Sequence, residues 1–378
     1  MMPLWKRVLF PPLAVLLGVG IPYLVAEGLR ALERGPRAGT SLAYDVYARW
    51  FAGRRVPPYD PHDPTTCVIS DPAPLAAMIE LFKANGVGIG NSPFHELKRD
   101  AVAINTEENG CVVQKPNLRK TMAFLRSNAF NPFDPPTYFH DTEHILPPEL
   151  ARFFDRYGFR RVQLTTNADG ERVTLPAVAA SDVVLVAGDS VANGAMLDDT
   201  ETIASRLQRD DRARQYVNLG IHGAAPADIE CGLERAARRY GGRVRELIYV
   251  FCENDFKEAT AADVVAWLVG FKARARIDRV VVLYVPYIYN ALPEVTRIRG
   301  HTHRNFPTFR DEKRALLSAA HDAGFLTVDY VDITTAAQQE QGTQFAALAL
   351  YLDHAHPSPA GVDRLVAAYQ QLGRGIAP

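Results

Sequence analysis

The stretch Val183-Val184-Leu185-Val186-Ala187-Gly188-Asp189-Ser190 decides the fold of this chain. Its first five residues are apolar and mostly β-branched, which is typical of a strand buried on both faces of a parallel sheet. Gly188 allows a tight or positive-φ turn where this strand ends. Open α/β sheets bind ligands at the carboxyl ends of their strands, so we expect Ser190 to lie at that edge. An ordinary strand-ending turn is the alternative.

Strand and helix patterns alternate from residue 181 onward. The apolar runs predict five strands separated by helices, which indicates a parallel sheet covered on both faces and connected by right-handed crossovers. The predicted strands are 183–187, 216–219, 247–252, 280–285 and 325–329, and the predicted helices are 200–209, 226–239, 261–275, 311–323 and 360–372.

Small polar residues follow the predicted strands, so the topology should bring them to one edge of the sheet. Ser190, Gly223 and Asn254 follow the first three strands, and Asp353 and His356 come after the fifth strand and a connecting helix. A serine nucleophile needs an adjacent base, and a histidine base needs a carboxylate that fixes its tautomer. One turn can bring Asp353 to Nδ1 of His356 and leave Nε2 for Ser190. The N–H groups of Ser190 and Gly223 and the Asn254 amide are candidate oxyanion donors.

Residues 181–375 resemble the SGNH, or GDSL, hydrolase superfamily, whose four sequence blocks are matched here by the segments around Ser190, Gly223, Asn254 and His356. The Gly188-Asp189-Ser190 turn and the Asp-x-x-His-Pro-Ser-x-x-Gly segment at 353–361 are the most specific parts of the resemblance. It implies a flavodoxin-like three-layer α/β/α fold and ester hydrolysis or acyl transfer. It also implies Ser190 as nucleophile, His356 as base, Asp353 as its orienting acid, and an oxyanion hole formed by Ser190, Gly223 and Asn254.

The chain departs from the family pattern at Glu253, where the family usually has a glycine before the asparagine of its third block. Either the loop has a different backbone, or Glu253 adds a negative charge near the site, which bears on the Asn254 donor. Asp189 is expected to accept hydrogen bonds from its own turn. His222 is a candidate pocket residue or a solvated loop histidine, and His354 competes with His356 as the base.

Other motifs are interpreted without a catalytic role. The second Asp-x-x-His, at 141–144, lies in a proline-rich stretch and is read as a chance match. His301 and His303 have no carboxylate or cysteine at ligand spacing, so we expect a flexible loop and no metal. No glycine-rich phosphate loop follows a strand, so we expect no cofactor. Cys231 and Cys252 are expected to pack as apolar side chains.

Residues 8–26 contain no charged side chain over 19 positions. As a helix they would span about 28 Å, close to the hydrocarbon thickness of a bilayer. We therefore predict an uncleaved membrane anchor within residues 1–39, with a buried core helix as the alternative. The basic residues on its two sides balance, so charge does not set its orientation. This anchor predicts a single-pass protein of the inner or cytoplasmic membrane whose catalytic domain lies outside the cytoplasm.

Residues 40–180 are rich in proline and poor in regular periodicity, which predicts an irregular α+β prelude packed on the domain at 181–378. Within it, the local pattern predicts helices at 75–83 and 118–127, a strand at 160–166 and a turn at 167–170. Cys67 and Cys111 can pair if the domain lies outside the cytoplasm. The scattered histidines are interpreted as solvated or structural; they are His62, His95, His140 and His144.

Charge and motifs together leave three hypotheses for function. With 42 basic and 43 acidic side chains, the chain has no general attraction to nucleic acid. The first hypothesis is a membrane-anchored serine esterase, because the anchor, prelude and domain together resemble tethered family members that act on acylated envelope glycans or lipids. The second is an O-acyltransferase to a sugar hydroxyl. The third is a non-catalytic glycan-binding scaffold, for which Glu253 is the best support. The oligomeric state stays open.

Overall fold

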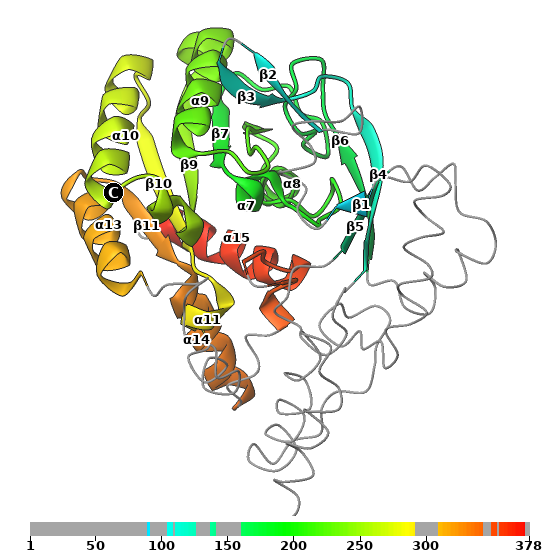
Figure 1. The fold of residues 1–378 in the computed structure, drawn as a ribbon. Helices are drawn as coiled ribbons and strands as arrows, with labels where there is room; N and C mark the ends of the chain where they lie inside the picture. The colour runs from blue at the N-terminus through cyan, green and yellow to red at the C-terminus, as the bar shows by residue number, and fades with distance from the viewer. Residues whose placement is uncertain are drawn as a thin grey trace, which may run out of the picture.

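A five-stranded parallel sheet forms the centre of the molecule (Figure 1). The computed structural model describes residues 89–90, 104–108, 110–125, 137–140, 160–291, 309–342, 349–353 and 355–374. The strands lie in the order β11-β10-β9-β7-β8, which is the flavodoxin-like order, so the chain reverses direction across the sheet between β7 and β9. Their bounds are β7 Val183–Gly188, β8 Gln215–Asn218, β9 Val244–Cys252, β10 Arg279–Val285 and β11 Leu326–Asp329.

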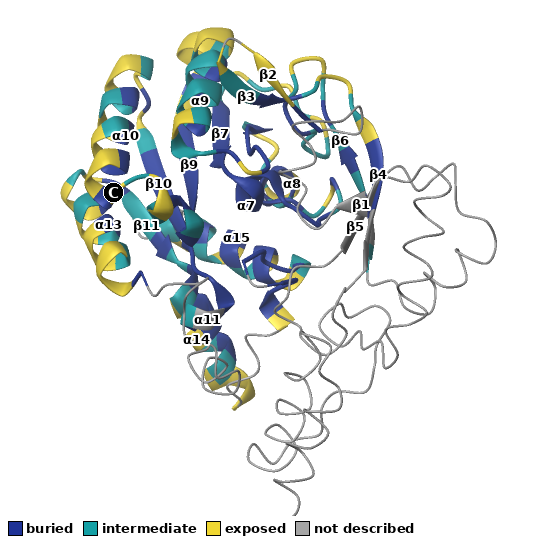
Figure 2. Cartoon of the chain, in the orientation of Figure 1, coloured by how far each residue is buried: buried dark blue, intermediate teal, exposed yellow. Residues whose placement is uncertain are grey.

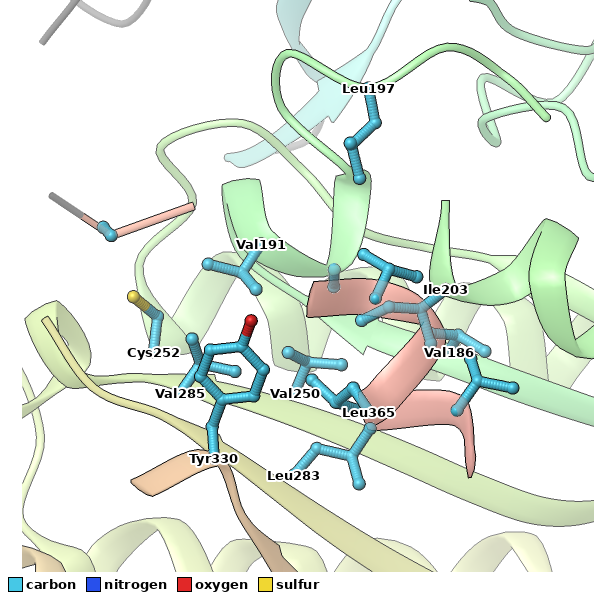
Figure 3. Packing of buried hydrophobic residues seen from close by; sticks show 14 of the residues in the cluster. Val186, Val191, Leu197, Ile203, Val250, Cys252, Leu283, Val285, Tyr330 and Leu365 are labelled. Atoms are coloured by element: carbon cyan, nitrogen blue, oxygen red, sulfur yellow. The ribbon is translucent and has the colours of Figure 1, made fainter. Parts of the chain in front are cut away.

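Helices cover both faces of this sheet, as the alternation of patterns predicts. Alternate strand residues point to opposite faces: Val184 and Val186 join one core cluster, and Val183 and Leu185 join the other. The first cluster holds α8 (Ile203–Asp210), α14 (Tyr330–Gln341) and α15 (Pro359–Arg374), and the second holds α9 (Pro226–Tyr240), α10 (Ala261–Ala275) and α13 (Arg310–Asp322). Figure 3 shows part of the first cluster, and the strands are buried along most of their length (Figure 2).

The five helices predicted between 200 and 372 are present, and side-chain caps mark the start of two of them. The predicted helix at 200–209 begins at Ile203, because the Thr202 hydroxyl accepts the Ser205 N–H at 3.2 Å and caps it. Thr260 and Asp263 form a capping box at the start of α10. Four shorter elements complete this part: α7 (Ser190–Asn193), η3 (Gly241–Arg243), η4 (Glu253–Lys257) and α11 (Ile288–Ala291).

The described part of the prelude contains an antiparallel sheet and a separate hairpin. The sheet has the order β1-β5-β4-β6, and the hairpin pairs β2 with β3. Their bounds are β1 Ile89–Gly90, β2 Asn105–Glu108, β3 Cys111–Gln114, β4 Arg119–Leu125, β5 Thr137–His140 and β6 Arg160–Thr165.

The helix predicted at 118–127 is wrong, because this segment forms strand β4. Its Met122 lies opposite Val162 of β6, and both side chains are buried. The local pattern fits either structure, and pairing with β5 and β6 satisfies the backbone of β4 as a strand. The strand predicted at 160–166 is confirmed as β6, and the turn at 167–170 is closed by a 3.1 Å bond from the Gly170 N–H to the Asn167 carbonyl.

A disulfide joins Cys111 of β3 to Cys231 of α9. The expected pairing of Cys67 with Cys111 is therefore wrong, and so is the expectation that Cys231 only packs. Spacing in the sequence does not say which sulfur atoms approach each other, and these two are 120 residues apart. Cys252 is buried with a free thiol, as expected.

Several predictions fall on residues outside those described. They are the anchor at 8–26, the helix at 75–83, the Asp-x-x-His at 141–144, and residues His62, Cys67, His95, His144, His301, His303 and His354. Among the residues that are described, none of the helices has both the length and the apolar character needed to cross a membrane.

Candidate active site

The turn after β7 places Ser190 at the carboxyl edge of the sheet, as predicted. Gly188 has a φ of +153°, and a Cβ at this position would collide with the Val250 carbonyl oxygen of the neighbouring strand β9. Only glycine therefore lets the chain turn this close to β9. The Asp189 carboxylate accepts the Val191 N–H at 2.9 Å and caps the short helix α7, whose first residue is Ser190.

The loop before α15 holds Asp353 and His356 in one turn. Asp353 Oδ1 accepts the N–H groups of Ala355 and His356, each at 2.8 Å, and Oδ2 lies 2.8 Å from Nδ1 of His356. One carboxylate thus closes the turn and orients the imidazole. The loop is also tied by a 2.7 Å bond from the Leu352 N–H to the His356 carbonyl.

The two segments meet at the reacting atoms. Nε2 of His356 lies 2.9 Å from Oγ of Ser190, although the residues are 166 positions apart. Ser190 is 5% exposed and His356 7% exposed, so the pair sits in a largely dry environment. The distance allows direct proton transfer from the hydroxyl to the imidazole.

The charges around His356 favour its protonated form. Burial by itself lowers the pKa of His356, but the charge and hydrogen bond of Asp353 and the charge of Asp189 outweigh it, so the pKa lies above its usual value. An imidazolium formed during a reaction would therefore be stabilised in place.

Asn254 and Gly223 lie on the two loops next to Ser190 in the sheet order. The Asn254 amide donates to Asp189 Oδ2 at 3.0 Å with one of its two N–H groups. Gly223 has a φ of +64°, a conformation that favours glycine. Asp189 is buried, which raises its pKa despite the hydrogen bonds from Val191 and Asn254.

Glu253 is engaged by a set of hydrogen bonds. Its carboxylate accepts the Tyr284 hydroxyl at 2.8 Å, the Tyr287 N–H at 2.7 Å and the Asn290 amide at 2.6 Å. Glu253 has no positive φ and begins the 3-10 helix η4. The backbone at this position therefore differs from a positive-φ glycine turn, as the first alternative expects, and the added negative charge of the second stays a prediction. Burial raises the pKa of the Glu253 carboxyl, partly offset by these hydrogen bonds.

His222 is buried, at 1% exposure, so the alternative of a solvated loop histidine is wrong. Its backbone carbonyl accepts the Asn105 side-chain amide at 2.7 Å. This contact links the Gly223 loop to the β2–β3 hairpin of the prelude.

Two buried residues near the site are absent from the sequence prediction. Arg172 donates to the carbonyls of Asn193, Gly194 and Leu197, which fixes the end of α7. Asp255 is buried, and burial together with the charge of Asp189 raises its pKa well above the usual value. Asp255 stands next to Asn254 in the sequence, but Arg172 lies in the prelude, where no pattern marks it.

No group of three or more histidine, cysteine, aspartate or glutamate side chains among the described residues is arranged to hold a metal. The contacts described above bring together a serine, a histidine, a carboxylate and an amide donor. This set is suited to acyl transfer through a covalent serine ester.

Of the comparisons with known proteins, only the one with solved structures finds matches to this chain. No protein-family model matches the chain, and no curated protein matches it. A member of the lipolytic G-D-S-L family from Veillonella parvula aligns at 14% identity and a TM-score of 0.38, covering 51% of this chain and 98% of that one. A catalytic mutant of an acetylxylan esterase from Geobacillus stearothermophilus aligns at 18% and 0.36, covering 51% and 94%. TesA aligns at 18% and 0.36, covering 52% and 100%.

Proposed function

We propose that this chain is a serine hydrolase that cleaves O-acyl esters through an acyl-enzyme on Ser190. The observation that carries the proposal is the continuous chain of contacts from Ser190 Oγ to His356 Nε2 at 2.9 Å and from His356 Nδ1 to Asp353 Oδ2 at 2.8 Å. This arrangement turns a weakly nucleophilic hydroxyl into a competent one.

The reaction follows from this geometry. His356 Nε2 takes the proton of Ser190 Oγ as the oxygen bonds to the ester carbonyl carbon, and the carbonyl becomes a tetrahedral oxyanion. The N–H groups of Ser190 and Gly223 and the second N–H of the Asn254 amide are the candidate donors to that charge. The intermediate collapses, and the leaving alcohol receives the proton from Nε2. Water then attacks the acyl-serine with His356 again as base, which releases the acid and restores Ser190.

The substrate we propose is an acylated glycan or lipid of the cell envelope, reached from a membrane anchor at residues 8–26. The apolar length of that segment supports the anchor. The Cys111–Cys231 disulfide supports an oxidising compartment, and hence a catalytic domain outside the cytoplasm. Fractionation of cells that express the full chain should place it in the membrane pellet after a salt wash; recovery in the supernatant would contradict the anchor.

The low exposure of Ser190 and His356 favours a second outcome for the acyl group, transfer to a sugar hydroxyl in place of water. The non-catalytic scaffold loses its best support, because the Glu253 carboxylate is engaged by Tyr284, Tyr287 and Asn290. Partition of a radiolabelled acetyl group between acetate and an added oligosaccharide separates hydrolase from transferase.

The proposed function is tested by labelling with a fluorophosphonate probe and by turnover of p-nitrophenyl acetate and butyrate. We expect the wild-type chain to be labelled and Ser190→Ala to lose both labelling and about 10⁴-fold or more of kcat/KM. Ser205→Ala is the matched control, since Ser205 is another buried serine, whose hydroxyl donates to the Asp199 carbonyl at 2.5 Å. Equal labelling and turnover in wild type and Ser190→Ala would refute the proposal.

A further inference from the structure

The β2–β3 hairpin of the prelude touches the loop that carries Gly223. Asn105 of β2 and Gln114 of β3 lie directly opposite each other in the hairpin register. The Asn105 amide donates to the His222 carbonyl at 2.7 Å, and the Gln114 amide donates to the Gly220 carbonyl at 2.8 Å. We infer that this hairpin positions the Gly223 N–H of the oxyanion hole, an inference that rests on the proposed function.

The planar peptide bond converts the Asn105 contact into an orientation of the Gly223 N–H. The His222 carbonyl and the Gly223 N–H belong to the same trans peptide unit, so they point in opposite directions. A donor that holds the carbonyl toward the hairpin therefore directs the N–H away from it. Asn105 acts at one remove: it is a positioning residue for the Gly223 donor.

The start of the same loop is held independently of Asn105. The Gly220 carbonyl accepts a second amide, that of Asn193, at 2.9 Å, and the N–H of Ile221 donates to the Gly188 carbonyl at 3.1 Å. The Gly220–Ile221 peptide is thus fixed at both ends against the Ser190 turn. The next two residues, His222 and Gly223, are the central residues of a turn that the Ala224 N–H closes on the Ile221 carbonyl at 3.2 Å, and Asn105 donates to the carbonyl of its central peptide.

The hairpin itself is anchored on the helix that follows the loop. The disulfide joins Cys111 to Cys231 of α9, and the Val112 N–H donates to Asp228 of α9 at 3.0 Å. Hairpin, loop and α9 therefore form a closed unit. Because the hairpin is fixed to α9, the helix that follows the loop, the Asn105 contact is made from a support that is itself held in place.

The side-chain amides of Asn105 and Gln114 contribute little to the stability of the fold, because only part of each amide is hydrogen-bonded. Asn105 is 7% exposed and Gln114 3% exposed, and the side-chain oxygen of each has no hydrogen-bond partner among the described residues. A buried polar atom without a partner costs about 1–3 kcal/mol. Replacing Asn105 by leucine removes the donor and this unpartnered oxygen together. Stability and activity should therefore respond differently to the change.

The test compares Asn105→Leu with wild type in the full chain. We expect kcat for p-nitrophenyl acetate to fall about 10- to 100-fold with KM unchanged, less than the loss of a whole oxyanion donor. The inhibition constant of a boronic acid, which forms the tetrahedral adduct on Ser190, should rise by the same factor. Hydrogen exchange of the peptide spanning 218–225 should become faster. Asn105→Ala, which loses the donor without adding a charge, should behave alike.

Gln208→Leu is the matched control for a purely structural amide. Gln208 is buried and donates to the carbonyls of Asp211 and Arg214 at 2.7 and 2.8 Å, outside the site. It should lower the melting temperature and leave kcat and the boronic acid constant unchanged.

Each outcome decides a separate claim. Unchanged exchange at 218–225 in both Asn105 variants would overturn the positioning contact. Faster exchange with unchanged boronic acid affinity would overturn its catalytic consequence. A wild-type chain without Ser190-dependent turnover would overturn the proposed function, while the exchange data would still decide whether the hairpin holds the loop.

Discussion

Both edges of the central sheet carry buried acidic groups, but the partners of these groups differ between the two edges. At the amino edge, Glu246 of β9 has a nearly buried side chain and is bound by Arg214 at 2.8 Å, Arg279 at 2.9 Å and the Tyr369 hydroxyl at 2.8 Å. Tyr216 adds a hydroxyl that accepts from Arg214 at 2.7 Å. The carboxylate is fully compensated there, as expected of a cluster that serves the fold.

At the carboxyl edge, acidic groups are buried close together. Burial raises the pKa of Asp189, and burial with the charge of Asp189 raises the pKa of Asp255 well above its usual value. The charge that acts on Asp189 is that of His356, and the charges that act on Asp255 are those of Asp189 and Glu258. Acidic groups whose pKa is raised by burial and by a neighbouring charge are common at functional sites. The comparison teaches that the acid at the amino edge is paired with two arginines, whereas the acids at the carboxyl edge are buried beside one another.

The largest effect is expected from His356→Ala, which should leave the fold intact. Removing the base should lower kcat/KM about 10⁵-fold, because the Ser190 hydroxyl loses its proton acceptor. Ester turnover measures the loss of activity, and thermal unfolding measures whether the fold is intact. The control is His321→Ala, an exposed histidine on α13. A large fall in the melting temperature of His356→Ala would mean that His356 also stabilises the fold, which would contradict this prediction.

Glu246→Gln tests the opposite edge and should act on stability alone. We expect the free energy of unfolding to fall by about 2–4 kcal/mol, since two arginines lose their shared anion, and their exposure of about 30% limits the loss. Urea unfolding followed by circular dichroism measures this, and kcat of the folded protein should not change. Glu234→Gln, which removes a surface partner of Arg274, serves as control and should have no measurable effect. A stable Glu246→Gln protein with reduced kcat would contradict the division.

The smallest effect concerns the pH profile. Neutral His356 is the active base, so kcat/KM should be high above the pKa of His356 and fall as pH drops through it, with a midpoint above 6.5. The Asp189 charge contributes to that rise, so Asp189→Asn should move the midpoint to lower pH. Glu253→Gln is the buried-acid control and should leave the midpoint in place. A midpoint that does not respond to Asp189→Asn would show that its charge does not reach the imidazole.

Prediction of the strands from the sequence succeeded where a continuous apolar run reflects burial in the sheet. The three inner strands β7, β9 and β10 are buried on both faces, so each contains an apolar run, such as 183–187 or 280–285. It failed at β4, where Met122 is buried and neighbouring positions mix polar and apolar residues. There, pairing with β5 and β6 outweighed a local preference that fits either structure.

Within the candidate site, the contact of Ser190 with His356 and Asp353 was predictable, and the residues that hold their loops were not. Ser190, Asp353 and His356 follow strands or precede a helix, and their order along the chain is informative. Asn105, Gln114 and Arg172 act through backbone carbonyls more than 20 residues away. Because any backbone carbonyl can accept such a bond, no residue type at the accepting end marks the contact.

The sequence alone determined the layers of the sheet domain, the edge at which its polar residues meet, and the Ser190–His356–Asp353 candidates, since apolar periodicity and chain order are local properties. Only the tertiary structure decided which cysteine bonds to Cys111, where the Glu253 carboxylate points, and that the prelude reaches the Gly223 loop. Those three outcomes depend on which atoms approach across the folded chain, and approach at long range is set by packing of the whole molecule.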